Sequence, residues 1–145
     1  MSCKVWAIVV TYNRKELLER CLDALHAQTR ACDHILIIDN ASTDGTDAWL
    51  KSAVDDHTSA YTMSHNTGGA GGFNAGMRLA FQNGADLLWL MDDDVIAAPD
   101  ALEQLLKART ELERRQAPHA FVVSTAWTEQ GLVTNAPDVD GRQNE

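Results

Sequence analysis

Short apolar runs alternate with segments of helical periodicity over residues 5–127, and this alternation is the feature that most constrains the fold. Runs rich in β-branched and long apolar side chains predict buried strands. These strands are expected at residues 5–10, 35–38, 60–64, 86–91 and 121–127. Apolar residues at helical spacing predict helices between them, at residues 15–29, 46–54, 72–82 and 99–115. Such alternation is typical of an α/β, Rossmann-like fold with a mostly parallel sheet and helices on both faces.

Polar residues follow three of the predicted strands, at the points where those strands end. They occupy residues 11–14, 39–40 and 92–94. In an open α/β sheet, ligands bind beyond the carboxyl ends of the strands, which meet along one edge of the sheet. We therefore expect these three segments to lie together in space and to form a binding site, although they are far apart in the sequence.

Asp92, Asp93 and Asp94 place three consecutive carboxylates directly after the most apolar run of the chain. Adjacent negative charges raise one another's pKa and cost free energy unless a cation neutralises them. Mg²⁺ and Mn²⁺ prefer such oxygen ligands. Because successive side chains of a strand point to opposite faces, Asp92 and Asp94 share a direction while Asp93 differs. The triplet therefore predicts a divalent-metal site; the alternative is a solvated acidic turn that caps the next helix.

A glycine-rich segment lies within residues 66–76 and opens the predicted helix at residues 72–82. Glycine lets the backbone approach a ligand closely, and the first turn of a helix can present free N–H groups to an anion. The segment therefore predicts a ligand contact; the alternative is a flexible loop. It matches neither a Walker A loop nor a dinucleotide fingerprint, because Asn74 stands where the third glycine of that fingerprint would be.

Charge and cysteine content narrow the classes of function. The formal net charge is −9 and the sequence pI is about 4.8, which argues against a nucleic-acid partner. The three cysteines have no metal or disulfide spacing and predict reduced thiols. The apolar run at residues 5–10 is too short for a secretory signal or a membrane span. We therefore expect a cytoplasmic chain, which could still lie at the inner face of a membrane.

Four sequence blocks together resemble inverting glycosyltransferase family two, whose members have the GT-A fold. The blocks lie at residues 9–14, 37–46, 66–76 and 90–94. The resemblance implies a UDP-sugar or dTDP-sugar donor, a Mn²⁺ or Mg²⁺ cofactor, and a carbohydrate or lipid-linked acceptor. Phe73 stands where many members have an arginine. This form of the third block, together with the acidic triplet, looks most like the galactofuranosyltransferase and rhamnosyltransferase branch. The phosphate contact of that arginine is then left to Arg14 or Arg78.

The same resemblance implies roles for individual residues. Thr11 and Asn13 would line the nucleoside pocket, Tyr12 would pack near the base, and Asp39 would hydrogen-bond the base. Asp92 would face the ribose or sugar, Asp94 would bind the metal, and Asp93 would lie between them. The predicted donor-binding residues are Thr11, Tyr12, Asn13, Arg14, Asp39, Asn66, Gly69, Gly72, Asn74, Asp92 and Asp93, and the predicted metal ligands are Asp92 and Asp94.

Members of the family are considerably longer, and their second half supplies the acceptor site and a catalytic Asp or Glu base. We therefore expect residues 1–128 to form a nucleotide-sugar-binding GT-A domain and residues 129–145 to form a polar tail that begins a missing acceptor-binding half. The catalytic base is unknown and is expected to lie outside this chain, which would be a fragment or a short natural protein with weak activity or none. Apolar surface uncovered in this way would favour self-association.

The expected function by resemblance is transfer of a sugar such as galactofuranose or rhamnose to an acceptor hydroxyl with inversion, in cell-envelope polysaccharide synthesis. The alternative is a non-catalytic nucleotide-sugar-binding or scaffold domain of the same fold. A nicotinamide-dependent oxidoreductase is disfavoured, because the glycines follow the third predicted strand rather than the first.

Overall fold

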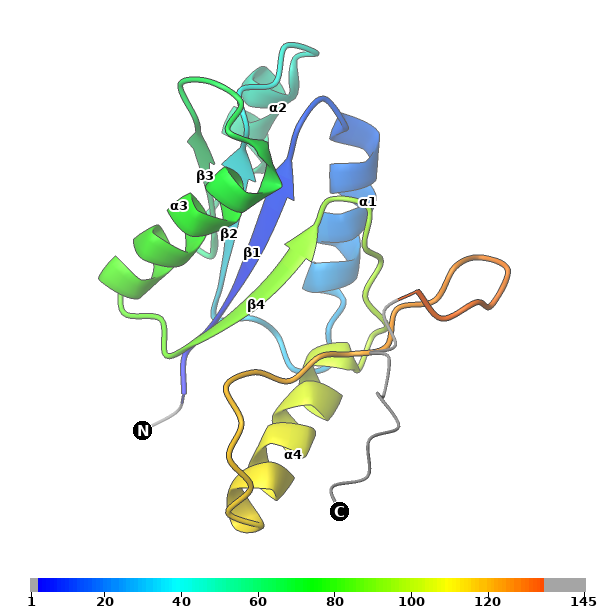
Figure 1. The fold of residues 1–145 in the computed structure, drawn as a ribbon. Coiled ribbons are helices and arrows are strands. Elements are labelled where there is room, and N and C mark those ends of the chain that lie inside the picture. Colours follow the sequence, from blue (N-terminus) through cyan, green and yellow to red (C-terminus); the bar gives the residue numbers. More distant parts are fainter. Residues whose placement is uncertain (1–2, 135–145) are drawn as a thin grey trace, which may run out of the picture. The chain divides into compact units, whose positions relative to one another are not determined.

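A computed structural model describes residues 3–134 of the chain (Figure 1). Strands and helices alternate along it, and the eight elements are β1 (Val5–Thr11), α1 (Lys15–His26), β2 (His34–Asp39), α2 (Thr46–Ala53), β3 (Thr58–Thr62), α3 (Gly68–Gln82), β4 (Leu87–Asp92) and α4 (Ala101–Arg114). The four strands form one parallel sheet in the order β3-β2-β1-β4. The predicted α/β fold with a parallel sheet is therefore confirmed.

The strand order changes direction at β1. The chain proceeds outward from β1 through β2 to β3 and then returns to the other side of β1 to form β4. The point at which such a sheet reverses its strand order is where open α/β folds bind ligands, beyond the carboxyl ends of the strands. In this chain that point lies between β1 and β4.

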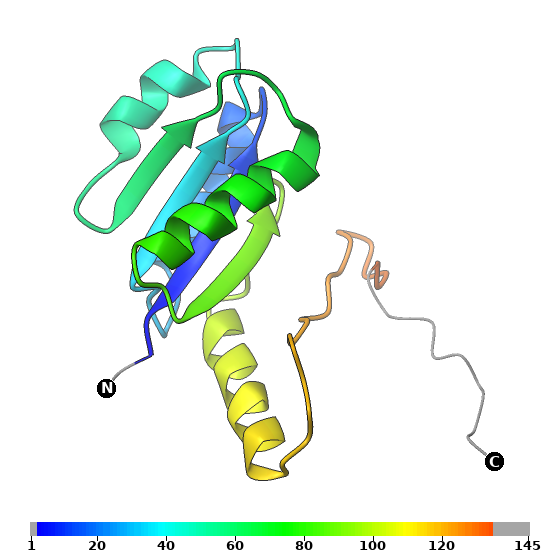
Figure 2. The same ribbon diagram turned by 60° about the vertical axis from the view of Figure 1, so that its left-hand side comes forward.

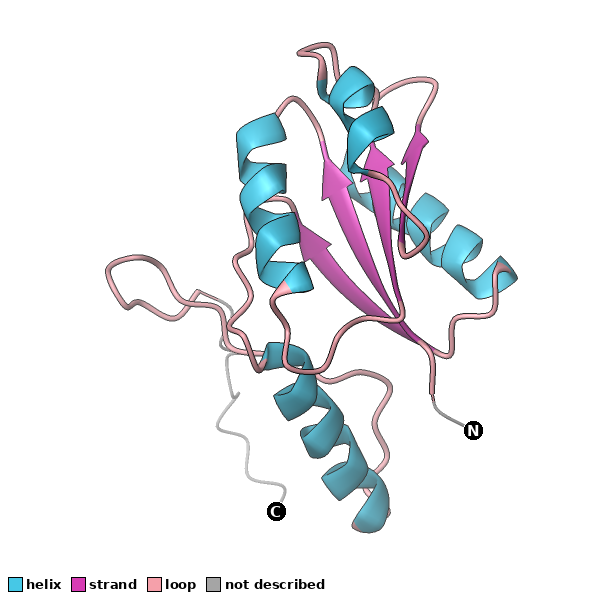
Figure 3. Ribbon diagram, turned by 180° about the vertical axis from the view of Figure 1, so that it is seen from behind, coloured by secondary structure: helices cyan, strands magenta, loops and turns pink. Residues whose placement is uncertain are grey.

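Two apolar layers cover the sheet, one on each face. On one face, Ala7 and Val9 of β1 pack with Leu18 of α1 and Leu50 of α2. On the other face, the alternate β1 side chains, including Ile8, pack against residues of α3. Figures 2 and 3 show the two sides, with α3 crossing one face of the sheet and α1 and α2 on the other. This arrangement confirms the prediction of helices on both faces.

Helix α3 begins at Gly68, four residues before the predicted start, so its glycines lie inside the helix rather than in a preceding loop. The reason is close packing on the sheet. A Cβ atom on Gly72 would lie 2.7 Å from Cγ1 of Val10, and one on Gly76 would lie 2.5 Å from Cγ2 of Ile8. Only glycine at these positions allows the helix to approach β1 so closely.

The predicted strand at residues 121–127 is wrong. Within residues 3–134, the sole pairing in this region is an isolated antiparallel bridge between Trp127 and Val133. A segment of high strand propensity becomes a strand when a neighbouring strand completes its backbone hydrogen bonds, and no described strand does so here.

The described residues divide into two compact units, with the boundary between Leu102 and Glu103. The sheet, α1, α2 and α3 all belong to the first unit, and most of α4 belongs to the second. The predicted change of domain at residue 128 stays a prediction, and residues 135–145 of the expected tail lie outside the described residues. Between residues 3 and 134, no helix combines the length and the apolar character needed to cross a membrane.

Candidate functional site

The carboxyl ends of β1, β2 and β4 bring the three predicted polar segments together. In the parallel register, Thr11 of β1 is opposite Asp39 of β2, and Val10 is opposite Asp92 of β4. Residues 11–14, 39–40 and 92–94 therefore follow adjacent strands at one edge of the sheet, as the sequence predicts.

The acidic triplet is divided between the solvent and the interior. Asp92 and Asp94 are exposed, whereas Asp93 is 3% exposed. The buried Asp93 accepts a 2.7 Å hydrogen bond at Oδ2 from the Thr11 hydroxyl. The carboxylate of Asp93 thus faces the protein in this conformation. The predicted contact between Asp93 and the donor stays a prediction. Asp92 and Asp94 are both exposed while Asp93 is buried, although β4 ends at Asp92 and the other two residues lie in the turn that follows.

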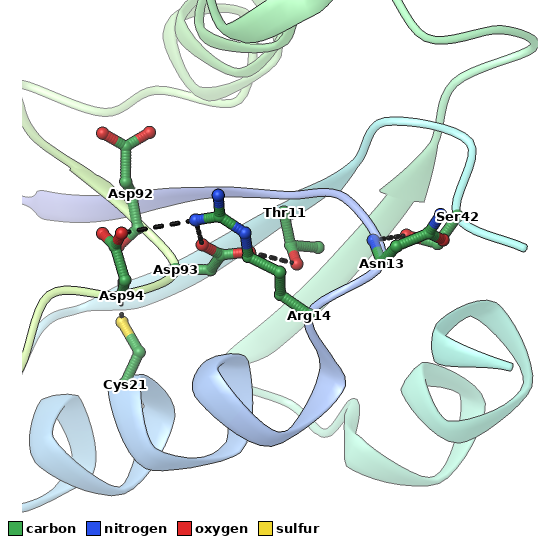
Figure 4. A network of polar contacts seen from close by, with 8 residues as sticks. All are labelled: Thr11, Asn13, Arg14, Cys21, Ser42, Asp92, Asp93 and Asp94. Carbon is green, nitrogen blue, oxygen red and sulfur yellow. Dashed lines mark hydrogen bonds and ion pairs between the residues drawn. The ribbon is translucent and has the colours of Figure 1, made fainter. Parts of the chain in front are cut away.

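Arg14 supplies the positive charge beside the triplet. Its Nη1 lies 3.4 Å from Oδ1 of Asp93 and 3.3 Å from Oδ2 of Asp94 (Figure 4). Burial raises the pKa of Asp92, as do the neighbouring charges of Asp94 and Asp93, while Arg14 acts in the opposite direction. The edge therefore holds more negative charge than this arginine balances.

Cys21 of α1 lies beneath the triplet, with its sulfur 3.9 Å from the backbone oxygen of Asp92. Burial raises the pKa of this thiol to about 12, and the charges of Asp93 and Asp94 contribute to the rise. The thiol is therefore neutral at physiological pH. It packs against the end of β4, and its raised pKa disfavours a role as a nucleophile, because that role requires the thiolate.

Asp92 and Asp94 could bind a divalent cation whose coordination shell is completed by oxygen atoms of a ligand. Nowhere in residues 3–134 do three or more His, Cys, Asp or Glu side chains gather to form a complete metal cage. Mg²⁺ is commonly bound by one or two carboxylates together with substrate phosphates. Two exposed carboxylates at a strand end match that mode of binding.

Asp39 has the feature that points most directly to a ligand. The residue is completely buried, and its Oδ1 accepts a 3.0 Å hydrogen bond from the backbone N–H of Ser42. Its Oδ2 is also buried but has no hydrogen-bond partner among the described residues. Buried acceptors without partners are rare and costly in native proteins. Because the oxygen has no exposed surface, a ligand N–H at this edge would satisfy it once the groups that cover it move aside.

Asn13 fixes the loop after β1 to the loop after β2. Its backbone N–H donates to Oγ of Ser42 at 2.9 Å, and its Oδ1 accepts from the backbone N–H of Thr43 at 2.7 Å. Its φ of 54° lies in the left-handed region, which asparagine tolerates better than most residues. The adjoining Tyr12 is 42% exposed, so its ring is available to a ligand.

Asn40 belongs to the polar segment predicted at residues 39–40, but its structural role was not predicted from the sequence. It is buried; its Oδ1 accepts from the backbone N–H of Thr67 at 2.9 Å, and its Nδ2 donates to the backbone oxygen of Gly68 at 2.9 Å. These bonds fasten the start of α3 to the end of β2. The signal in the sequence is its place directly after Asp39, but its partners, 27 and 28 residues away, are visible only in the fold.

The predicted donor contacts on α3 fall into two groups. Asn66, Gly69 and Asn74 are exposed, and a Cβ atom added to Gly69 would meet no atom within 4 Å. Gly72 is buried against Val10, and this packing accounts for a glycine there without a ligand. The start of α3 therefore offers open backbone at Gly69.

Similarity to known proteins agrees with this geometry. Galactofuranosyltransferase GlfT1 of Mycobacterium tuberculosis is 44% identical over 98 residues, which cover 65% of this chain and 31% of that protein. Undecaprenyl-phosphate mannosyltransferase of Micrococcus luteus is 34% identical over 107 residues, covering 72% of this chain and 44% of the relative. The chain thus spans less than half the length of these relatives.

Solved structures share the fold. A mannosyltransferase from Pyrobaculum calidifontis, determined with GDP-Man and Mn²⁺, superimposes with a TM-score of 0.64 at 28% identity, over 74% of this chain and 32% of that one. TarS of S. aureus gives a TM-score of 0.62 at 19% identity, over 78% of this chain and 20% of that one, and supports the fold alone. Residues 6–125 match the family described as glycosyl transferase family 2. The chain therefore belongs to glycosyl transferase family 2.

Proposed function

We propose that this chain is the donor-binding part of a metal-dependent glycosyltransferase. The proposed reaction moves a sugar such as galactofuranose or rhamnose from a UDP- or dTDP-sugar to an acceptor hydroxyl, with inversion, in the synthesis of cell-envelope polysaccharide. Support comes from the family match and from 44% identity to a galactofuranosyltransferase. Because the chain spans 31% of that relative, the activity of a whole enzyme is part of the proposal.

The observation that carries the proposal is the unpartnered Oδ2 of Asp39. It is buried at the same sheet edge as the exposed Asp92 and Asp94. Uracil and thymine each carry an imide N–H, which is the donor that a buried carboxylate oxygen lacks here. With the base at Asp39, the diphosphate would extend along the edge toward the acidic triplet, where a cation is needed.

Mn²⁺ or Mg²⁺ would be held by Asp92 and Asp94 together with the donor's phosphate oxygens; the relative from Pyrobaculum calidifontis was solved with Mn²⁺. When bound, the ion would act as a Lewis acid on the departing diphosphate. The chain's own contribution is to bind and orient the donor. Asp93, which accepts a hydrogen bond from Thr11, keeps the end of β4 in register with β1. Asn13 holds together the loops that follow β1 and β2, where the nucleoside would bind.

No residue of this chain is assigned as the base that deprotonates the acceptor. Loss of a general base lowers rates by about 10²–10⁴-fold, so the chain alone should bind donor but transfer sugar poorly. We propose that the acceptor is a carbohydrate or a lipid-linked sugar. A cytoplasmic location at the inner face of the membrane, where such acceptors are reached, belongs to the same proposal.

Calorimetry separates the base contact from the metal contact. We expect Asp94→Asn and Asp92→Asn to weaken binding of UDP in the presence of Mn²⁺ by at least the roughly 10–100-fold that outer-shell changes cost at metal sites. Binding of uridine, which has no phosphate, should not change in these variants. Asp39→Asn should weaken uridine and UDP alike. Asp56→Asn, an exposed acidic residue between α2 and β3, is the matched control.

The proposal fails if the wild-type chain binds neither UDP nor uridine. It also fails if UDP binding with Mn²⁺ is the same in the Asp92→Asn, Asp94→Asn and Asp56→Asn variants, because the acidic triplet would then have no part in holding the diphosphate.

Self-association is a further part of the proposal. β4 is an edge strand of the described sheet, and its Leu88 and Leu90 are 37% and 43% exposed. Exposed apolar side chains on an edge strand favour association between chains. Light scattering should detect dimers or larger species that a Leu88→Lys, Leu90→Lys double variant lacks; a monomeric wild-type chain would contradict this expectation.

A further inference from the structure

Arg14 lies where a cation bound to the acidic triplet would compete with it. One nitrogen, Nη1, reaches both Asp93 and Asp94, at 3.4 Å and 3.3 Å (Figure 4). The two carboxylates differ, however: the side chain of Asp93 is 4% exposed, whereas that of Asp94 is 53% exposed. The same guanidinium thus contacts one fixed, buried carboxylate and one that is open to solvent.

We propose that Arg14 is an internal counter-cation that holds Asp94 in the nucleotide-free chain and is transferred to the donor's diphosphate when metal and nucleotide bind. Arg14 then opposes binding of the metal alone and favours binding of the nucleotide, so that the two ligands bind cooperatively. This inference rests on the proposed function, because it assumes that Asp94 is a metal ligand.

Competition follows from charge. A divalent cation on the carboxylate of Asp94 would lie within a few ångströms of the guanidinium that already contacts Oδ2, and like charges at such distances repel. The pair with Asp94 is easily broken, because an exposed ion pair changes an equilibrium by only about 1.4- to 5-fold. Arg14 therefore weakens, but does not prevent, binding of a metal ion at Asp94.

Asp93 provides the pivot. Its carboxylate is buried and accepts the Thr11 hydroxyl at 2.7 Å, so it stays in place while Arg14 leaves Asp94. Arg14 is itself 53% exposed and immediately precedes α1, and its long side chain can turn outward around this pivot. A diphosphate is a good new partner, because guanidinium groups match phosphate oxygens in geometry and charge.

Lys15 is a matched control on the next residue. Its ammonium lies 3.7 Å from Oε1 of Glu19 and 5.8 Å from the ring centroid of Trp49. Lys15→Gln therefore removes the same charge from the same segment without removing a contact to Asp93 or Asp94.

The test measures metal and nucleotide separately. Mn²⁺ binding to the nucleotide-free chain is followed by electron paramagnetic resonance of free Mn²⁺, and UDP binding without metal is followed by calorimetry. We expect Arg14→Gln to raise Mn²⁺ affinity by about 2- to 10-fold, from loss of one nearby positive charge, and to lower UDP affinity. Lys15→Gln should change neither affinity, and Arg14→Lys, which keeps the charge, should bind Mn²⁺ much as the wild type does.

Opposite shifts of the two affinities distinguish this role from simple damage to the fold, which would lower both. Arg14→Met, which retains the aliphatic stem, is made alongside in case Arg14→Gln does not fold. Unchanged or weaker Mn²⁺ binding in the folded Arg14 variant overturns the inference while leaving the proposed function intact. Absence of Mn²⁺ binding in the nucleotide-free wild type and in every variant also overturns the inference, because Arg14 then has no metal to compete with at Asp94; the metal site of the proposed function is tested separately, with UDP present.

Discussion

Gly76→Ala should destabilise the fold by steric conflict between α3 and the sheet. The added Cβ would lie 2.5 Å from Cγ2 of Ile8 and 3.1 Å from Cγ1 of Ile38. Both isoleucines are fully buried, and a β-branched side chain has little freedom to move aside. Overpacking costs about 1–3 kcal/mol, and the better helix propensity of alanine returns at most about 1 kcal/mol. Because a 2.5 Å contact is a severe overlap, we expect a cost in the upper part of this range, about 2–3 kcal/mol, and so a net loss of about 1–2 kcal/mol.

Gly69→Ala, at the start of the same helix, is the comparison. An added Cβ there meets nothing within 4 Å, and the residue is exposed. We expect its stability to be unchanged or slightly higher, and its UDP affinity to fall, because Gly69 is a predicted donor contact. Urea unfolding followed by circular dichroism gives both stabilities, and calorimetry gives the affinity. A Gly76→Ala chain as stable as the wild type would refute the close-packing explanation for the glycines.

Three other predictions concern pH, thiol reactivity and the start of α3. Burial lowers the pKa of His34 below its ordinary 6.5, so the unfolded chain binds this proton more readily than the folded chain as the pH falls. The contribution of His34 to the free energy of unfolding should therefore be full above about pH 6.5 and decrease below it. His34→Gln should reduce this pH dependence in urea unfolding measured at a series of pH values. Because burial raises the pKa of Cys21 to about 12, iodoacetamide at pH 8 should leave Cys21 unmodified in the native chain and modify it after unfolding, as read by mass spectrometry. Asn40→Ala should cost about 1–3 kcal/mol because it leaves the backbone N–H of Thr67 without its partner; equal urea midpoints for this variant and the wild type would contradict the assigned role.

The elements that the sequence predicts well are those whose burial is one-sided or complete. Along β1, all residues but Trp6 are buried, so an unbroken apolar run marks a central parallel strand. The buried residues of α1, such as Leu18 and Leu25, recur at helical spacing, and this spacing marks a helix in the sequence. Both signals are local, and both predictions are confirmed.

The failures share a different cause, because each depends on contacts between distant segments. Residues 121–127 have the composition of a strand, but composition carries no information on whether a partner strand exists. The glycines of α3 look like a loop because helix propensity disfavours them. The reason that glycine is required at these positions is visible only in the folded chain, where Ile8 and Val10 lie directly beneath the helix. Tertiary packing overrode local propensity there.

The candidate site lies between these two cases. The acidic triplet, Asp39 and the residues after β1 are recognisable because each directly follows an apolar run, and parallel strands must place those ends on one edge. The sequence does not reveal that β4 returns to the far side of β1. That return places the triplet beside Arg14 and Thr11 rather than beside Asp39. The strand order thereby separates an acidic end from a buried acceptor at Asp39. On the proposed function, a cation would bind at the acidic end and an N–H donor at Asp39, and a nucleoside diphosphate would carry both the N–H-bearing ring and the metal-binding group.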